Sequence, residues 1–157
     1  MINKILAVLA LSVAILSAAP IKLDTPIYKF NSYKFETPQG RNMRVPRKTD
    51  LVIVAFEKET GALVNKYLDT KDPYYLLKKR TIFIADINKM PDMITKMFAL
   101  PKLKKYKHLI YLHYGEKFQN DIPHKQDMIT LFSIEHGKVK DISYITTVKE
   151  LQAAIEK

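Results

Sequence analysis

Continuous apolar runs alternate along the chain with segments in which apolar residues recur every three or four positions. The runs 51–56, 81–87 and 108–114 are typical of strands that are covered on both faces of a sheet. After the first run, Thr60 is placed to cap a helix over 61–68 whose apolar side chains share one face. The pattern therefore predicts buried strands joined by helices.

Helix signals also follow later in the chain. Asp72 and Pro73 suit the cap and the first position of a helical turn that reaches Lys79. Asn88 is placed to cap a longer helix, which Pro101 should bend or restart because proline lacks the backbone N–H. The apolar stripe of this helix consists of Met90, Met93, Ile94, Met97, Phe98 and Leu100.

The C-terminal part of the chain predicts a hairpin followed by a helix. Residues 115–126 are polar and have the composition of a loop. The apolar runs 128–134 and 139–145 flank the four-residue connection 135–138, and 148–155 has helical spacing.

Before the first buried strand, the sequence predicts a short antiparallel ribbon. Residues 27–30 and 33–36 alternate apolar with polar side chains, and 38–40 have the composition of a turn. Residues 46–50 then form a polar connector. The ribbon would lie ahead of the main domain.

The first residues have the pattern of an export signal. Lys4 precedes the uncharged stretch 5–19, and this stretch ends in the small residues that signal peptidase requires. The stretch is shorter than the roughly 20 residues that cross a bilayer as a helix. We expect cleavage after Ala18 and a periplasmic or secreted protein, and the alternative is an uncleaved anchor. The predicted organisation is a leader over 1–18, the ribbon and connector over 19–50, and one domain over 51–157.

The order of elements, parallel strands and helices followed by a hairpin and a last helix, requires a mixed sheet. This order resembles the thioredoxin fold over 51–157, with 108–126 as an inserted strand and loop. The expected fold class is therefore α/β: a thioredoxin-like mixed sheet flanked by helices, with an N-terminal β-ribbon.

A more specific resemblance rests on four short motifs. They are Ile84-Ala85-Asp86-Ile87, Met90-Pro91, Met97-Phe98-Ala99-Leu100-Pro101-Lys102 and Tyr106. They look like those of a family of uncharacterised, cysteine-less exported proteins of Gram-negative bacteria, some of which carry a flavin-dehydrogenase label. This resemblance implies a fold and a compartment, and it implies no established activity.

The chain contains no cysteine, and this excludes the usual chemistry of thioredoxins. In those proteins the reactive pair lies where the first strand turns into the first helix, and here that segment is Glu57-Lys58-Glu59-Thr60-Gly61. Thiol–disulfide exchange requires a thiolate, which neither a carboxylate nor a hydroxyl can replace. Disulfide bonds and a lipid anchor on an N-terminal cysteine are excluded by the same absence.

Motifs of other enzyme classes are missing as well. The chain has four glycines, and none has the spacing of a dinucleotide or phosphate loop. Its histidines lack the local spacing of a helical zinc site, so we predict neither a metal nor a cofactor.

A site for an enzyme or a small ligand, a flavin included, stays open at the strand ends. Sheets of this type place their sites there, and the candidate residues are Glu57, Thr60 and Asp86. The structural alternative is that Glu57 faces solvent and that Asp86 orders the following loop by bonding backbone amides.

A formal net charge of +10 favours a negatively charged partner. Because lysines directly follow the apolar stripe that begins at Met90, we predict a binding module that docks an acidic protein or another anionic envelope component there. Nucleic acid is not expected, since no recognition motif is present. The alternative is a solvated basic surface. The predicted partner-binding residues are Phe98, Pro101, Lys102, Lys104, Lys105 and Tyr106.

Overall fold

The computed structural model describes residues 20–157, and the leader with its predicted cleavage site lies outside this range. The strands are β1 (Phe35–Glu36), β2 (Asn42–Met43), β3 (Leu51–Ala55), β4 (Thr81–Asp86), β5 (Tyr111–His113), β6 (Ile129–Glu135) and β7 (Lys138–Ile145). The helices are η1 (Ile27–Ser32), α1 (Lys58–Asp69), α2 (Tyr75–Lys78), α3 (Asp92–Ile94), η2 (Thr95–Ala99), α4 (Leu100–Leu103), α5 (Glu116–Asp121) and α6 (Val148–Ile155). The strands form one mixed sheet in the order β2-β1-β5-β4-β3-β6-β7.

The central strands are parallel, and the C-terminal hairpin is antiparallel to them. β3 pairs in parallel with β4, and β4 with β5, whereas β6 is antiparallel to both β3 and β7. Every residue of β3 and β4 is buried, as their continuous apolar runs predict. The mixed α/β sheet flanked by helices is thereby confirmed.

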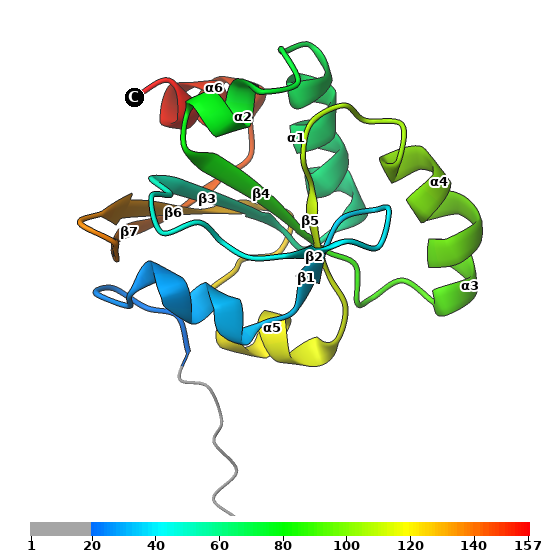
Figure 1. Ribbon diagram of the computed structural model, residues 1–157, viewed down its shortest axis with the longest axis horizontal. Helices are drawn as coiled ribbons and strands as arrows, with labels where there is room; N and C mark the ends of the chain where they lie inside the picture. The colour runs from blue at the N-terminus through cyan, green and yellow to red at the C-terminus, as the bar shows by residue number, and fades with distance from the viewer. Residues whose placement is uncertain (1–19) are drawn as a thin grey trace, which may run out of the picture.

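Two apolar cores lie on opposite faces of the sheet (Figure 1). One is covered by η1 and α5, where the rings of Phe30 and Phe118 are fully buried. The other is covered by α1, α2 and α6, and Val64, Leu68 and Leu151 are its fully buried helical members. Helices on both faces explain why the central strands are apolar throughout.

The N-terminal ribbon differs from its prediction. Residues 27–32 form the 3₁₀-helix η1 because Ile27 and Phe30, three positions apart, both point into the core. The antiparallel pair is instead β1 with β2, around the turn that ends at Gly40. Glu36 of β1 pairs with Leu112 of β5, so the ribbon extends the main sheet instead of preceding it.

Helix boundaries also differ from their predictions. α2 begins at Tyr75 with Tyr74 as its N-cap, and not at Asp72 and Pro73. α1 begins at Lys58 with Glu57 as its N-cap, so Thr60, the predicted cap, lies inside the first turn. The helix expected after Asn88 begins at Asp92. The predicted loop 115–126 contains α5, which buries Phe118. Among the described residues, no helix has the length and the apolar character needed to cross a membrane.

The C-terminal hairpin and helix are close to their predictions. The hairpin turn needs only His136 and Gly137, both with positive φ, because Glu135 already pairs with Lys138. α6 spans 148–155 as predicted, and its cap is reciprocal: Thr147 Oγ1 accepts the Glu150 N–H at 3.2 Å, and Glu150 Oε2 accepts the Thr147 N–H at 3.0 Å.

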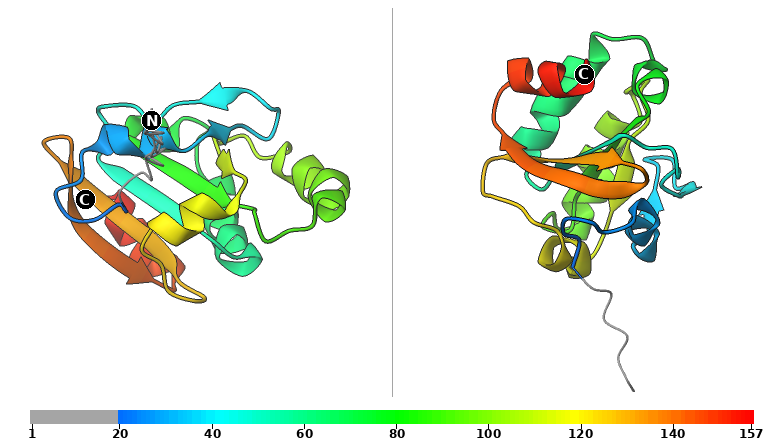
Figure 2. Two further views of the ribbon diagram at one scale, coloured as in Figure 1. Left: turned by 90° about the horizontal axis from the view of Figure 1, so that it is seen from below. Right: turned by 90° about the vertical axis from the view of Figure 1, so that its left-hand side faces the viewer.

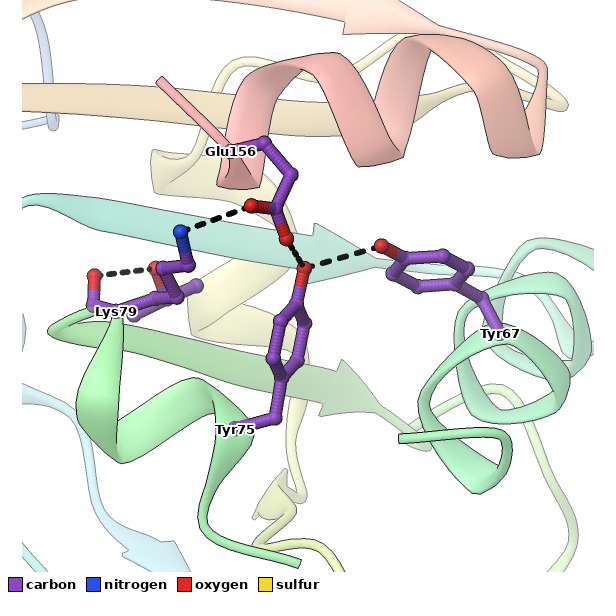
Figure 3. A network of polar contacts seen from close by, with 5 residues as sticks. Tyr67, Tyr75, Lys79 and Glu156 are labelled. Carbon is purple, nitrogen blue, oxygen red and sulfur yellow. Dashed lines mark hydrogen bonds and ion pairs between the residues drawn. The ribbon is translucent and has the colours of Figure 1, made fainter. Parts of the chain in front are cut away.

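A polar network ties the C-terminus to the helices beside it (Figure 3). Tyr75 of α2 donates its hydroxyl hydrogen bond to Glu156, just after α6, and its oxygen lies 3.0 Å from the hydroxyl of Tyr67 on α1. Lys79 forms an ion pair with the same carboxylate at 2.9 Å. The hydrogen bond from Tyr75 and the lysine hold the pKa of Glu156 below its usual range. This network joins α1, α2 and α6 on one face of the sheet.

Candidate functional site

A pocket of about 560 Å³ opens where β3 and β4 end. Its walls are these strand ends, the first turns of α1, and a helical arm formed by α3, η2 and α4 (92–103). The arm stands apart from the helices that cover the sheet, next to the end at which β3 and β4 finish (Figures 1 and 2). Carboxyl ends of parallel strands are where α/β sheets place their ligands.

The residues predicted at the strand ends only partly come together. Glu57 and Asp86 both line the pocket, from the ends of neighbouring strands. Thr60 does not line it, and its hydroxyl donates to the Glu57 carbonyl at 3.0 Å. The Glu57 N–H donates to the same hydroxyl at 3.3 Å, so Thr60 supports the start of the helix.

Asp86 is buried and shapes the loop that leads to the arm. Its Oδ1 accepts the Asn88 N–H at 3.2 Å, and its Oδ2 accepts the Asn88 side-chain N–H at 3.3 Å. This is the backbone bond that the sequence predicts for Asp86. Asn88, predicted to cap the helix, instead closes this turn and donates to the Gly115 carbonyl at 3.1 Å.

A buried histidine lies behind Asp86. His113 Nδ1 on β5 is 3.6 Å from Asp86 Oδ1, and it has no hydrogen-bond partner among the described residues. Aromatic rings enclose the imidazole, with ring centroids 4.8 Å away for Phe118 and 6.0 Å for Phe35. Asp86 is therefore held between the pocket and an aromatic cage.

The residues predicted to bind a partner divide into two sets. Phe98, Lys102 and Tyr106 are four positions apart and line the pocket together. Pro101, Lys104 and Lys105 are exposed and do not line it. The arm thus presents one apolar face to the pocket and a lysine-rich edge to solvent.

The arm contains a π-helical turn just before Pro101. The Leu100 N–H donates to the Thr95 carbonyl, five residues back, and this widens the helix. Pro101 has no N–H to donate to the Met97 carbonyl, and a widened turn also relieves the contact of its ring with the preceding turn. The helix therefore continues through proline to Leu103 instead of restarting.

Sequence reasoning missed one polar pair behind the pocket. Asn65 of α1 lines the pocket although it is 4% exposed, and its Oδ1 lies 2.8 Å from His108 Nε2. An amide oxygen only accepts, so His108 donates this hydrogen bond. Burial lowers the pKa of His108 to about 4, which keeps the ring neutral near pH 7. Since Oδ1 is engaged, the NH₂ group is the part of Asn65 available to a ligand.

Charge around the pocket is mixed, with lysines at its rim. Lys58, Lys89 and Lys102 are exposed lining residues, whereas Glu57 and Asp86 lie at the strand ends. Residues 20–157 contain no group of three or more acidic or histidine side chains arranged to hold a metal ion. The pocket is therefore suited to binding an apolar body through its walls and a negative group at its rim.

Neither a scan against protein-family models nor a search of curated proteins gives a match. The search of solved structures does give matches. The thioredoxin domain of a thiol-disulfide oxidoreductase from Bacteroides vulgatus matches with a TM-score of 0.52 and 16% identity, over 88% of this chain and 96% of that chain. Peroxiredoxin Q of Xanthomonas campestris matches with a TM-score of 0.54 and 10% identity, over 88% and 96%. An SCO1/SenC family lipoprotein from Bacillus anthracis matches with a TM-score of 0.52 and 11% identity, over 88% and 94%.

This chain has the thioredoxin-like fold. At these identities the similarity extends to the fold alone. The chain lacks cysteine, and in the segment that carries the reactive pair in thioredoxins, here 57–61, Glu57, Lys58 and Gly61 line the pocket instead.

Proposed function

We propose that this chain is a non-redox binding protein, and that its strand-end pocket takes a small ligand with an apolar body and a negative group. One observation carries the proposal: two regions singled out separately in the sequence, at the strand ends and on the arm, line a single pocket. Its volume of about 560 Å³ suits a small molecule, since such sites span roughly 300–1,000 Å³.

The charges suggest how the ligand would lie. Glu57 and Asp86 disfavour negative charge at the strand ends, so an acidic group would face Lys89 and Lys102 at the exposed rim. The apolar part would then reach past Phe98 towards the walls that α1 and the strands provide. Asn65 offers a buried amide donor on that side.

A second candidate function is the docking of an acidic partner protein on the outer edge of the arm. It is favoured by Pro101, Lys104 and Lys105, which are exposed and lie outside the pocket. Both candidates would act in the periplasm or outside the cell, where the leader pattern would direct the chain.

A thermal-shift screen tests the first candidate. The probes are carboxylates of increasing chain length, with flavins, nucleotides, metal ions and sugars as the other classes. A ligand present at a hundred times its Kd adds about 2.7 kcal/mol to the stability, which raises Tm by several degrees. We expect the carboxylates to raise Tm, with a larger shift for longer chains. If only a flavin, nucleotide, metal ion or sugar raised Tm, the proposed ligand class would be wrong.

Two variants locate the binding site. Ala62→Trp places a large side chain at an exposed lining position and should abolish the shift. Lys102→Glu should weaken binding about tenfold by reversing a rim charge. Lys140→Glu on β7, exposed and outside the pocket, makes the same charge change and should leave binding intact. Equal binding by all three variants would exclude this pocket.

A separate double variant distinguishes the second candidate function from the first. Lys104→Glu with Lys105→Glu should abolish capture of an acidic partner while the carboxylate shift stays unchanged. Unchanged capture by this double variant would exclude partner docking on the outer edge.

A further inference from the structure

Large apolar side chains are exposed together in the first half of the arm, over 93–98, and we call this part the tip. Met93 is 69% exposed, Met97 62%, Phe98 64% and Ile94 44%. The other exposed large apolar residues of the described chain are scattered over the N-terminal segment, the region of α2, the residues on either side of β5 and the start of α6. Scattered exposed residues are normal on a protein surface, whereas a contiguous cluster marks an interaction site.

The cluster forms one stripe along the arm. Positions 93, 94, 97 and 98 follow the helical spacing that places side chains on one side of a helix. Ile94 and Phe98 also line the pocket, whereas Met93 and Met97 lie outside it. A role in lining the pocket therefore does not explain why the two methionines are exposed.

Lysines precede and follow this stripe along the chain. Within 88–107 the only acidic residue is Asp92. None of the lysines of this segment belongs to an ion pair within the described residues. They are Lys89, Lys96, Lys102, Lys104, Lys105 and Lys107, and all are exposed.

The second half of the arm packs its apolar side chains into the core, whereas the buried residue of the first half is Thr95. Leu100, Leu103 and Tyr106 pack against the core that α1, α2 and α6 cover, and the stripe precedes them. Figures 1 and 2 show the whole arm, α3 together with α4, set to one side of the sheet. Ile94 and Phe98 of this stripe therefore face the pocket, whereas Met93 and Met97 are exposed outside it.

We propose that this tip docks on the surface of a bilayer that contains anionic phospholipids. The apolar side chains would enter the boundary between headgroups and acyl chains, and the lysines beside them would reach the lipid phosphates. An apolar tip with lysines before and after it in the chain matches this boundary. An acidic protein would match the lysines, but it would also need a groove to cover the methionines. The proposal goes beyond the ligand pocket and does not depend on it.

The chain has no tryptophan, so a single introduced tryptophan reports on one position. Met97→Trp places it on the tip, and Leu77→Trp places it on α2 at a comparable exposure, 71%, beside Lys78 and Lys79. With phosphatidylglycerol-containing vesicles, we expect the emission of Met97→Trp to shift to shorter wavelength and that of Leu77→Trp to stay unchanged. All variants carry the same N-terminus, checked by mass spectrometry, so any effect of the leader is common to them.

Co-sedimentation with the same vesicles gives the binding strength. The double variant Met93→Ser and Met97→Ser should bind at least tenfold more weakly than the unmodified chain. The matched pair Tyr74→Ser and Leu77→Ser should bind as the unmodified chain does. Pure phosphatidylcholine vesicles should bind weakly, and binding to the anionic vesicles should fall as salt is added.

Three results would overturn the proposal. They are equal binding to phosphatidylcholine and anionic vesicles, binding that is insensitive to the methionine changes, and an equal spectral shift for both tryptophans. Failure to bind vesicles, together with lysine-dependent capture of an acidic protein, would also overturn it and would favour a protein partner.

Discussion

The C-terminal helix α6 and the arm are both short helical elements, but α6 buries its large apolar side chains whereas the first half of the arm exposes them. α6 buries Leu151 and Ile155, has a reciprocal cap, and is tied to α2 through Glu156. α3 and η2 have no side-chain cap and bury no large apolar residue, and they expose methionines instead. The difference separates an element selected for packing from one available for binding.

The largest expected effect tests this contrast directly. Leu151→Ala removes a fully buried side chain from the core under α6 and should lower the free energy of unfolding by about 2–5 kcal/mol. Met97→Ala on the arm should change it by less than about 0.5 kcal/mol, because that side chain is exposed. Urea denaturation measures both. Similar losses in the two variants would mean that the arm is part of the core.

A smaller effect concerns His108, which lies behind the pocket. Its pKa is about 4 in the folded chain, because burial disfavours the charged ring and the nearby Asp69 offsets this only in part. The unfolded chain, with an ordinary pKa near 6.5, takes up the proton first. The stabilising contribution is therefore complete above about pH 6.5 and is lost as the pH falls through 4, by about 3 kcal/mol.

Unfolding measured between pH 7 and pH 4 checks this prediction. His108→Gln should flatten the pH dependence relative to the unmodified chain. His136→Asn, at the exposed hairpin turn, should retain it. An equally steep fall in all three proteins would show that His108 is not the group responsible.

The cap of α6 should contribute less than its core contacts. Thr147→Ala removes the hydroxyl that accepts the Glu150 N–H and should cost about 1 kcal/mol. Thr146→Ala, next to the cap, is the control and should cost less, because only its backbone N–H bonds Glu150. Equal losses would mean that the cap does not stabilise α6.

The smallest expected effect is a gain at the pocket wall. Gly61 lies inside α1, and a Cβ there would meet only the Cβ of Ala55, at 3.9 Å. Gly61→Ala should therefore raise stability by about 0.5–1 kcal/mol through helix propensity. Thermal unfolding measures the gain. A loss of stability would mean that this wall of the pocket is packed more tightly than the structure shows.

The buried strands and α6 could be predicted because their signals are local. Continuous apolar runs mark β3 and β4, and helical spacing marks 148–155. η1 and α5 could not be predicted in the same way. Residues 27–30 and 33–36 alternate as strands do, and α5 carries Phe118 as its only buried residue. Their conformations depend on the core that they cover.

The candidate site shows the same limit. The sequence points to Glu57, Asp86 and Phe98 separately, and only the parallel pairing of β3 with β4 and the path of the arm bring them to one pocket. The contact of Asn65 with His108 joins α1 to the start of the segment that leads into β5, far along the chain. No spacing pattern in the sequence predicts a contact between two residues so far apart in the chain.

An NMR titration of the chain with a medium-chain carboxylate, kept below its micellar concentration, tests the central claim most directly. The account predicts that backbone shifts change at the pocket-lining parts of α1, of 86–90 and of 94–106, and that 148–156 stays unchanged. Ala62→Trp should remove these changes. Shifts that are absent, or that gather at α6 instead of the arm, would contradict the assignment of this pocket as the binding site.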